Sequence, residues 1–299
     1  MIIFLGLFLR ARLRYDDAFW DAAERLVFKV LFPPLLFLSV AQSRLTPSSA
    51  ALFLSVGVSS MLLAVVASAS LRLFIKDNPV THASVFQCGF RFNTYIGFSI
   101  CLQLFDQTGF ALLALLIAFW VPISNTIAVS VLASAVAKAE GGAVGKKHSV
   151  FKTIVTNPLI IATVLGLAWN VTGWTIPTVP AVFLKHLGSA SLAMGLLCIG
   201  AGLRLQAFRG HGALIVASTI ERLMVVPAIA WGMGAVFGLS SVQAGVLLLF
   251  AALPTAQSCY VMTATMRGDA ASVAGVTTAQ TLAAMATLPV WTALIQSLT

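Results

Sequence analysis

Long runs of mainly apolar residues recur along the whole chain and are separated by short polar turns. Runs such as 109–137 and 213–238 exceed the roughly twenty residues that a helix needs to cross the hydrocarbon core of a bilayer. The composition agrees with this pattern. Of 299 residues, 59% are hydrophobic and 9% are charged, whereas soluble proteins carry roughly 25% charged residues. The sequence therefore predicts an all-α polytopic membrane protein.

The charge, the cysteines and the missing motifs exclude several classes of function. The net charge of +9 would suggest nucleic-acid binding in a soluble protein, but here it is expected from loops that border an anionic membrane surface. No nucleic-acid partner is therefore predicted. The four cysteines fall in apolar runs without the spacing of a metal site, so no metal and no cofactor are expected. The motifs of zinc peptidases, serine hydrolases and nucleotide-binding loops are absent from the sequence, so the chain is not expected to be an enzyme.

Ten transmembrane helices are predicted, and the first is truncated. Residues 1–9 are apolar but too few to span a bilayer, so we interpret them as the remaining end of a first span, shortened for instance by a misplaced start codon. A short interfacial or re-entrant helix is the alternative. The ten predicted segments are 1–9, 26–41, 47–73, 82–105, 109–137, 158–174, a seventh that follows Pro180 and ends near 205, 213–238, 242–266 and 270–298.

The two halves of the chain resemble each other weakly. Val164-Leu165-Gly166-Leu167 repeats the pattern of Phe4-Leu5-Gly6-Leu7 after 160 positions, and a long polar stretch lies between the halves. Because each half has an odd number of spans, the second copy must be inverted relative to the first, as in many secondary transporters. We divide the chain into a first five-helix repeat (1–140), a cytoplasmic linker (141–156) and a second, inverted five-helix repeat (157–299).

The loop charges predict the orientation in the membrane. Fourteen of the Lys and Arg residues flank the loops that follow the odd-numbered spans, whereas only Arg44 and Lys185 lie on the opposite side. The positive-inside rule then places the fourteen in the cytoplasm and both termini outside. The fourteen are Arg10, Arg12, Arg14, Arg25, Lys29, Arg72, Lys76, Lys138, Lys146, Lys147, Lys152, Arg204, Arg209 and Arg267.

A proline interrupts the ninth predicted span. Pro254 removes a backbone donor in the middle of the apolar run 242–266, so the helix must kink or break there. Freed backbone groups are tolerated at membrane depth only when they are buried in protein or line a watered cavity. Thr255, Gln257 and Ser258 supply polar groups at the same depth. The segment is therefore either a substrate site or a simple proline kink whose hydroxyl groups bond back to their own helix.

Two arginines lie inside predicted spans, Arg222 in the eighth and Arg91 in the fourth. A mid-membrane arginine costs at least ~2.5 kcal/mol and should face protein or water. Each arginine either belongs to a structural ion pair or offsets the charge of an anionic substrate. Glu221 adjoins Arg222 in sequence but points about 100° away around the helix, so this pairing is not automatic.

Polar side chains in the fourth and fifth spans have the same two interpretations. Asn93 and Thr94 follow Arg91 and form a helix-weakening patch at the place in the first repeat that corresponds to Pro254 in the second. Asn125 lies three residues after Pro122 in the fifth span. Each of these side chains is either structural or part of the substrate site.

Six short motifs are spread over nearly the whole chain: Phe32-Pro33-Pro34-Leu35-Leu36-Phe37, Gly89-Phe90-Arg91-Phe92-Asn93-Thr94, Pro122-Ile123-Ser124-Asn125, Asn157-Pro158-Leu159-Ile160, Gly202-Leu203-Arg204 and Leu253-Pro254-Thr255-Ala256. In this order they resemble the auxin efflux carrier family, in its bacterial, malonate transporter-like branch. The resemblance implies a five-plus-five inverted repeat with broken, crossing fourth and ninth helices, and organic-anion transport by an elevator-type movement. Family members carry a proline in the fourth-span break, where this chain has Phe98-Ser99-Ile100, so a milder first break is expected.

The chain is therefore expected to be a permease of the bacterial cytoplasmic (inner) membrane that moves a small organic anion such as a mono- or dicarboxylate. Amino ends of half-helices at the two breaks would bind the anion. A channel and a non-transporting receptor or scaffold are the alternatives. The expected partners are the anion and the lipid bilayer, and a homodimer is left open. The predicted substrate-binding residues are Arg91, Asn93, Thr94, Asn125, Arg222, Pro254, Thr255, Gln257 and Ser258.

Overall fold

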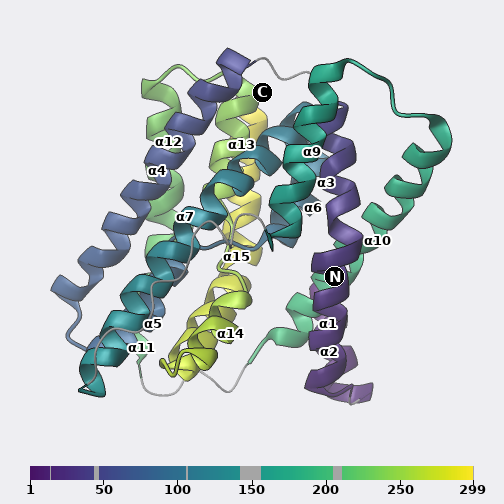
Figure 1. Ribbon diagram of the computed structural model, residues 1–299. Coiled ribbons are helices and arrows are strands. Elements are labelled where there is room, and N and C mark those ends of the chain that lie inside the picture. Colours follow the sequence, from purple (N-terminus) through teal and green to yellow (C-terminus); the bar gives the residue numbers. More distant parts are fainter. Residues whose placement is uncertain (14, 44–46, 106, 142–155, 205–210, 299) are drawn as a thin grey trace. The chain divides into compact units, whose positions relative to one another are not determined.

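The computed structural model describes residues 1–13, 15–43, 47–105, 107–141, 156–204 and 211–298. All regular elements within these ranges are helices (Figure 1), so the all-α prediction is confirmed. The elements are α1 (Ile2–Leu13), α2 (Asp17–Leu26), η1 (Val27–Leu31), α3 (Phe32–Ala41), α4 (Pro47–Phe74), α5 (Pro79–Phe86), η2 (Gln87–Gly89), α6 (Thr94–Leu104), α7 (Gln107–Ala139), α9 (Pro158–Thr172), α10 (Thr178–Gly202), α11 (Gly212–Ile220), η3 (Glu221–Val225), α12 (Val226–Val236), α13 (Ser241–Ala252), α14 (Ser258–Thr265) and α15 (Ala270–Leu298).

Five helical segments of the described chain are long and apolar enough to cross a membrane: 50–74, 107–139, 178–202, 212–236 and 270–297. The other predicted spans correspond to shorter or interrupted helices. For example, α1 has 12 residues and α9 has 15. The helices support an integral membrane protein, while ten spans and an inverted repeat remain predictions. The predicted linker 141–156 lies almost entirely outside the described residues, as do several loop cations (Arg14, Arg44, Lys146, Lys147, Lys152 and Arg209).

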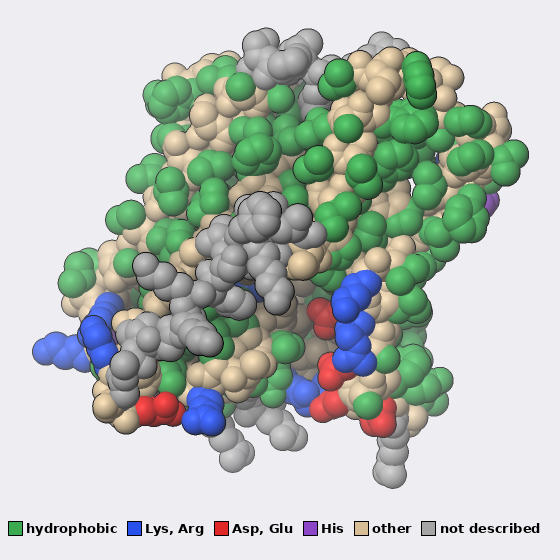
Figure 2. Space-filling view, in the orientation of Figure 1, with side chains coloured by type: hydrophobic (Ala, Val, Ile, Leu, Met, Phe, Trp, Pro, Cys, Tyr) green, Lys and Arg blue, Asp and Glu red, His purple; other side chains and the backbone are tan. Residues whose placement is uncertain are grey.

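Hydrophobic side chains are spread widely over the face seen in Figure 2. On α4, Leu62, Leu63 and Val66 are 44%, 44% and 64% exposed. Soluble monomers rarely expose large contiguous apolar patches. Lipid tails, by contrast, are as apolar as leucine, so these side chains are compatible with the hydrocarbon core of a bilayer.

The described chain forms two compact units, and each unit takes segments from both halves of the sequence. Unit 1 comprises residues 1–50, 98–118 and 151–203, and unit 2 comprises residues 51–97, 119–150 and 204–299. The long helix α7 contributes to both units. The units are defined by packing, whereas the two predicted repeats concern sequence copies, so the repeats remain a prediction.

Glycines allow the helices of unit 1 to approach closely. A Cβ atom on Gly6 of α1 would lie 2.0 Å from the carbonyl oxygen of Leu197 in α10, and a Cβ atom on Gly200 of α10 would lie 1.8 Å from the carbonyl oxygen of Ile3. Helix pairs in membranes depend on such small residues because no hydrophobic effect drives the helices together. Asn170 of α9 adds two hydrogen bonds, from Nδ2 to the carbonyl oxygens of Ala41 and Ser43 at the end of α3.

Pro227 lies inside the long helical segment α11–η3–α12 of unit 2, which continues through it. Pro227 has no N–H group, so the carbonyl group of Leu223, four residues earlier, has no partner in a regular helix. The indole Nε1 of Trp291 on α15 donates to this carbonyl oxygen at 2.9 Å. The turn before Pro227 is a π-helix, Glu221–Val225. π-Helical turns inside α-helices are often found at functional sites, and this turn carries both Glu221 and Arg222.

A candidate substrate site at two broken helices

The ninth predicted span is broken where the sequence predicts it. Helix α13 ends at Ala252 and α14 begins at Ser258, and residues 253–257 are not helical. Pro254 and Thr255 are buried in this interruption. The segment is therefore a break in the helix, and the interpretation as a simple proline kink is wrong.

The fourth span is also broken, at residues 90–93, and Phe98-Ser99-Ile100 lie within α6. That the first break is milder than the second stays a prediction. Helix α5 and the short 3₁₀ turn η2 end at Gly89, and α6 begins at Thr94. The backbone N–H group of Asn93 donates to the carbonyl oxygen of Pro254 at 2.8 Å, so the two broken segments are joined directly. The Phe92 and Phe250 rings also pack together, with centroids 4.3 Å apart. The contact between the two chain segments opens the fourth span without a proline.

Asn93 has a local structural role that the sequence did not identify. Its Oδ1 accepts a hydrogen bond from the backbone N–H group of Ile96 at 3.3 Å, and its side chain is 3% exposed. Asparagine is a preferred residue in this capping position, because its side chain satisfies one of the free N–H groups at the start of a helix. Asn93 therefore caps α6.

Arg222 is fully buried and uses all three guanidinium nitrogens on backbone oxygens. Nε donates to Leu253 at 2.7 Å, Nη1 donates to Gly89 at 3.2 Å, and Nη2 donates to Phe250 at 3.4 Å. These carbonyl groups lie at the carboxyl ends of α13 and η2, where helices leave carbonyls unpaired and carry partial negative charge. Arg222 thus binds the carboxyl ends of the two helices that precede the breaks.

Thr255 is held by a residue that the sequence reasoning missed. Its backbone N–H and its Oγ1 both donate to Oε1 of Gln280 on α15, at 3.0 and 2.5 Å, and Oγ1 is also 2.5 Å from the carbonyl oxygen of Cys88. Nε2 of Gln280 donates to the carbonyl oxygen of Ser218 on α11. A glutamine inside the apolar run 270–298 was the available sign of such a role, because amides in membrane helices commonly bond across helices.

Arg91 connects η2, before the first break, with the amino end of α14, after the second break. Nη1 donates to Oε1 of Gln87 at 2.6 Å, and Nη2 donates to Oγ of Ser258 at 3.0 Å. Ser258 is the first residue of α14 and is exposed. The positive charge of Arg91 therefore lies beside a helix amino end, which carries a partial positive charge of its own.

Gln257 has an amide nitrogen without a partner at this amino end. Its Nε2 is buried and makes no hydrogen bond to any described residue. Thr94, at the start of α6, is partly exposed. Asn125 lies on α7, is partly exposed and makes no hydrogen bond among the described side chains, so the structure does not bring it into the bonded set around the breaks.

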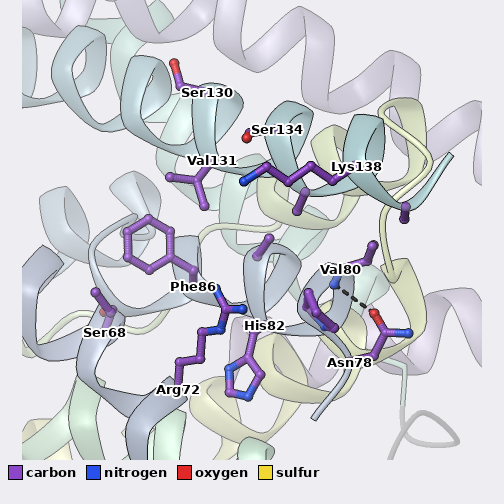
Figure 3. Close-up of a pocket in the computed structure, with 15 residues that line it drawn as sticks. Ser68, Arg72, Asn78, Val80, His82, Phe86, Ser130, Val131, Ser134 and Lys138 are labelled. Atoms are coloured by element: carbon purple, nitrogen blue, oxygen red, sulfur yellow. Dashed lines mark hydrogen bonds between the residues drawn. The ribbon is translucent and has the colours of Figure 1, made fainter. Parts of the chain in front are cut away.

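A cavity of about 930 Å³ opens in unit 2 among α4, α5 and α7. Arg72 and Lys138 line it together with the polar residues Asn78 and His82, and Phe86 contributes an apolar wall (Figure 3). Among the described residues that line the cavity, none is a carboxylate. The cavity is therefore a cationic compartment with apolar walls.

Three connecting segments of unit 2 meet at one histidine. Nδ1 of His211, just before α11, lies 2.6 Å from Oδ2 of Asp77, and Nε2 lies 3.7 Å from Oδ2 of Asp269. Burial tends to raise the pKa of Asp269, but hydrogen bonds from Ser272 and Thr81 outweigh burial, so this pKa lies below its ordinary value. The pKa of Asp77 is also lowered, because hydrogen bonds from the Asn78 N–H and His211 outweigh its burial.

Comparison with known proteins adds evidence that is independent of this geometry. A family model described as "Membrane transport protein" matches residues 1–292. An uncharacterized transporter of Methanothermobacter thermautotrophicus is 22% identical over 300 residues, which cover 99% of this chain and 95% of that protein. An uncharacterized transporter of Methanocaldococcus jannaschii is 22% identical over 171 residues, which cover 56% of this chain and 53% of that protein.

Proposed function

Because the chain belongs to the membrane transport protein family, the auxin efflux carrier family that its motifs resemble, we propose that it is a secondary active transporter of a small organic anion, such as a mono- or dicarboxylate. The observation that carries the choice of an anion is the cluster at the amino end of α14. There Arg91 contacts Ser258, and the buried Nε2 of Gln257 has no partner among the described residues. Unpaired N–H groups at a helix amino end, next to a full positive charge, favour a carboxylate.

The two arginines have different roles in this proposal. The three nitrogens of Arg222 already donate to carbonyl oxygens of the protein, so Arg222 supports the breaks. Arg91, which is 9% exposed and contacts Ser258 at the start of α14, supplies the charge that offsets the anion. Gln257, Ser258 and Thr94 supply hydrogen-bond donors, whereas Asn93, Pro254 and Thr255 shape the backbone around them.

The proposed mechanism is of the elevator type. Such a mechanism requires one compact body that carries the whole substrate site, and both breaks belong to unit 2. We propose further that the cation-rich loops face the cytoplasm of a bacterial cell and that both termini face outward. The basic cavity lined by Arg72 and Lys138 would then raise the local concentration of the anion on the cytoplasmic side.

The test is uptake of radiolabelled mono- and dicarboxylates by liposomes that contain the purified protein. We expect saturable uptake and counterflow of at least one carboxylate. In Gln257→Ala, binding of that anion should weaken by roughly 1–3 kcal/mol, the range for a hydrogen bond to a charged group. Pro254→Ala should reduce transport more than thermal stability, because it restores a backbone donor and favours a continuous helix.

Gln296→Ala serves as the matched control, because Gln296 is exposed on α15 and no described residue bonds its side chain. Uptake that does not saturate would favour a channel. Binding without uptake or counterflow would favour a receptor. If Gln257→Ala binds the anion as well as the unmodified protein does, the substrate site lies elsewhere.

A further inference from the structure

Glu221 is the only carboxylate in the five helical segments that are long and apolar enough to span a membrane. It is 4% exposed. Ser68 of α4 donates a hydrogen bond from Oγ to Oε1 of Glu221 at 2.8 Å. The second oxygen, Oε2, is buried and has no hydrogen-bond partner among the described residues.

Arg222 does not neutralise this carboxylate through a direct ion pair. Its three nitrogens donate to the carbonyl oxygens of Leu253, Gly89 and Phe250. Within the described part of the chain, no contact of 4 Å or less joins the guanidinium group of Arg222 to Glu221. An ionised carboxylate with one buried, unpartnered oxygen is expensive, and a bound proton removes that cost.

A small hollow beside Glu221 borders the large cavity of unit 2. A small hollow of about 10 Å³ is lined by Glu221, Ser68, His82 and Ser218 together with apolar residues. Its size is close to the space that one water molecule needs, and its polar lining supplies hydrogen-bonding partners. Ser68, His82 and Phe86 also line the cavity of about 930 Å³ (Figure 3). The hollow and the cavity therefore share a wall. Nε2 of His82 lies 2.7 Å from the carbonyl oxygen of Ile75, so Nδ1 is the ring nitrogen left to exchange a proton with water.

Glu221 also touches the first helix break. A Cβ atom on Gly89 would lie 2.5 and 2.7 Å from the two carboxylate oxygens of Glu221, so the carboxyl group lies directly against this glycine. The carbonyl oxygen of the same Gly89 accepts the Nη1 donor of Arg222. A change of charge on Glu221 therefore takes place next to the Gly89 carbonyl group that Arg222 binds.

We propose that Glu221 is a proton-binding site, reached through His82 from the cavity lined by Arg72 and Lys138, and that its protonation is coupled to movement of the broken helices. The inference rests on the proposed function for the coupling, and on the geometry alone for the binding of a proton. The step is a simple association, in which a hydronium ion transfers a proton to a carboxylate oxygen and leaves a water molecule; release of the proton is the reverse. The charged or titratable groups that face Glu221 are Arg222 beside it, Cys88 of η2, His82 of α5 and Arg72, one turn after Ser68 on α4.

The direct test is an infrared titration of the purified full-length protein in lipid. A protonated carboxyl group has a carbonyl-stretch band that shifts in D2O and disappears on ionisation. We expect the unmodified protein to show one titrating band that is absent from Glu221→Gln. Glu140→Gln is the matched control, because Glu140 is an exposed carboxylate whose side chain is 54% accessible. It should leave the band unchanged.

Ser68→Ala provides a second variant that keeps the carboxyl group. Without the Ser68 hydroxyl, the ionised form loses its hydrogen bond, so the midpoint of the band should rise by about one pH unit. His82→Leu should shift the midpoint less than Ser68→Ala does. It should, however, slow the appearance of the band after a pH jump. If Glu221→Gln shows the same titrating bands as the unmodified protein, or if Ser68→Ala does not move the midpoint of the Glu221 band, the assignment is wrong.

A transport measurement separates this inference from the proposed function. In liposomes, a proton gradient directed inward, with the exterior acidic, should drive uptake of the carboxylate by the unmodified protein but not by Glu221→Gln. Counterflow of the anion should persist in the variant. If the variant still responds to the pH gradient, coupling through Glu221 is wrong although the protein is a transporter. If no carboxylate is transported, the proposed function fails, and the infrared titration still decides whether Glu221 binds a proton.

Discussion

Replacing Arg222 with methionine removes the side chain that holds both helix breaks from their carboxyl ends. Methionine is similar in length and apolar, so it fills much of the same space but donates no hydrogen bond. Arg222 is 0% exposed, so water does not reach the oxygens that lose their donor without local opening of the structure. Arg222→Met therefore leaves the carbonyl oxygens of Leu253, Gly89 and Phe250 without this partner.

The expected loss of stability follows from these three hydrogen bonds. Each buried carbonyl group that loses its partner costs roughly 1–3 kcal/mol. The bonds to Leu253 and Gly89, at 2.7 and 3.2 Å, should dominate, because the bond to Phe250 is long at 3.4 Å. Removing a buried charge returns part of its desolvation cost. We therefore expect the free energy of unfolding to fall by about 3–5 kcal/mol.

The assay is unfolding of the purified protein by a denaturing detergent in mixed micelles, followed by circular dichroism. Arg222→Lys should fall between the unmodified protein and Arg222→Met, because an ammonium group cannot reproduce the planar set of donors of arginine. Lys185→Met, at an exposed position of α10, is the control for removal of a positive charge and should change little.

A particular result would refute this reasoning. If Arg222→Met unfolds at the same detergent concentration as the unmodified protein but no longer binds the carboxylate, Arg222 is a substrate ligand. Its hydrogen bonds to the carbonyl oxygens would then be dispensable, and the breaks would be held by other contacts, such as the bond from Asn93 to Pro254.

Two further predictions concern the loops of unit 2 and the helix contact of unit 1. The pKa of Asp269 is lowered in the folded protein, so its contribution to stability is complete above the ordinary value of 3.8 and is lost as the pH falls through the lowered value. The melting temperature of Asp269→Asn should therefore fall less steeply below about pH 4 than that of the unmodified protein. In unit 1, Gly200→Ala should destabilise by roughly 1–3 kcal/mol, because its Cβ would lie 1.8 Å from the carbonyl oxygen of Ile3. Gly232→Ala, where a Cβ atom meets nothing within 4 Å, should not destabilise, and equal melting temperatures for the two alanine variants would contradict the close-contact argument.

Local chemistry made much of the helical organisation predictable. The amide of Asn157 and the proline after it predict the start of α9, and the structure confirms that Asn157 accepts a hydrogen bond from the N–H group of Leu159. The break at Pro254 follows from the missing N–H group of proline, which acts on its own helix wherever that helix packs. Such features depend on neighbours within about one helical turn, so the order of residues is sufficient to predict them.

The break in the fourth span shows where local reasoning ends. The tripeptide Phe98-Ser99-Ile100 has no proline, and it lies within the continuous helix α6. The helix is open earlier, at residues 90–93, where the N–H group of Asn93 has a partner in Pro254, far away in sequence. A backbone group can leave its helix at little cost when another segment supplies its hydrogen bond, and only the folded chain determines whether that segment is adjacent.

The roles of the polar residues within the spans were decided in the same way. The sequence identified Arg222 as a buried cation but left open whether it bonds the protein or a substrate, and the structure shows its three nitrogens on backbone oxygens. Gln280 and Ser68 were not identified, because one amide or hydroxyl in an apolar run has no local pattern that names its partner. Their partners, Thr255 and Glu221, lie 25 and 153 positions away.

The sequence by itself determined that the chain is helical, apolar and interrupted at Pro254, because backbone geometry and transfer from water to lipid act on each residue separately. Only the tertiary structure decided which helices pack together and that both compact units interleave segments from the two halves of the chain. The physical reason is that a helix apolar on every side has no stripe that marks its buried face. Close fits, such as Gly6 against Leu197, select the partner instead, and they exist only when both backbones are in place.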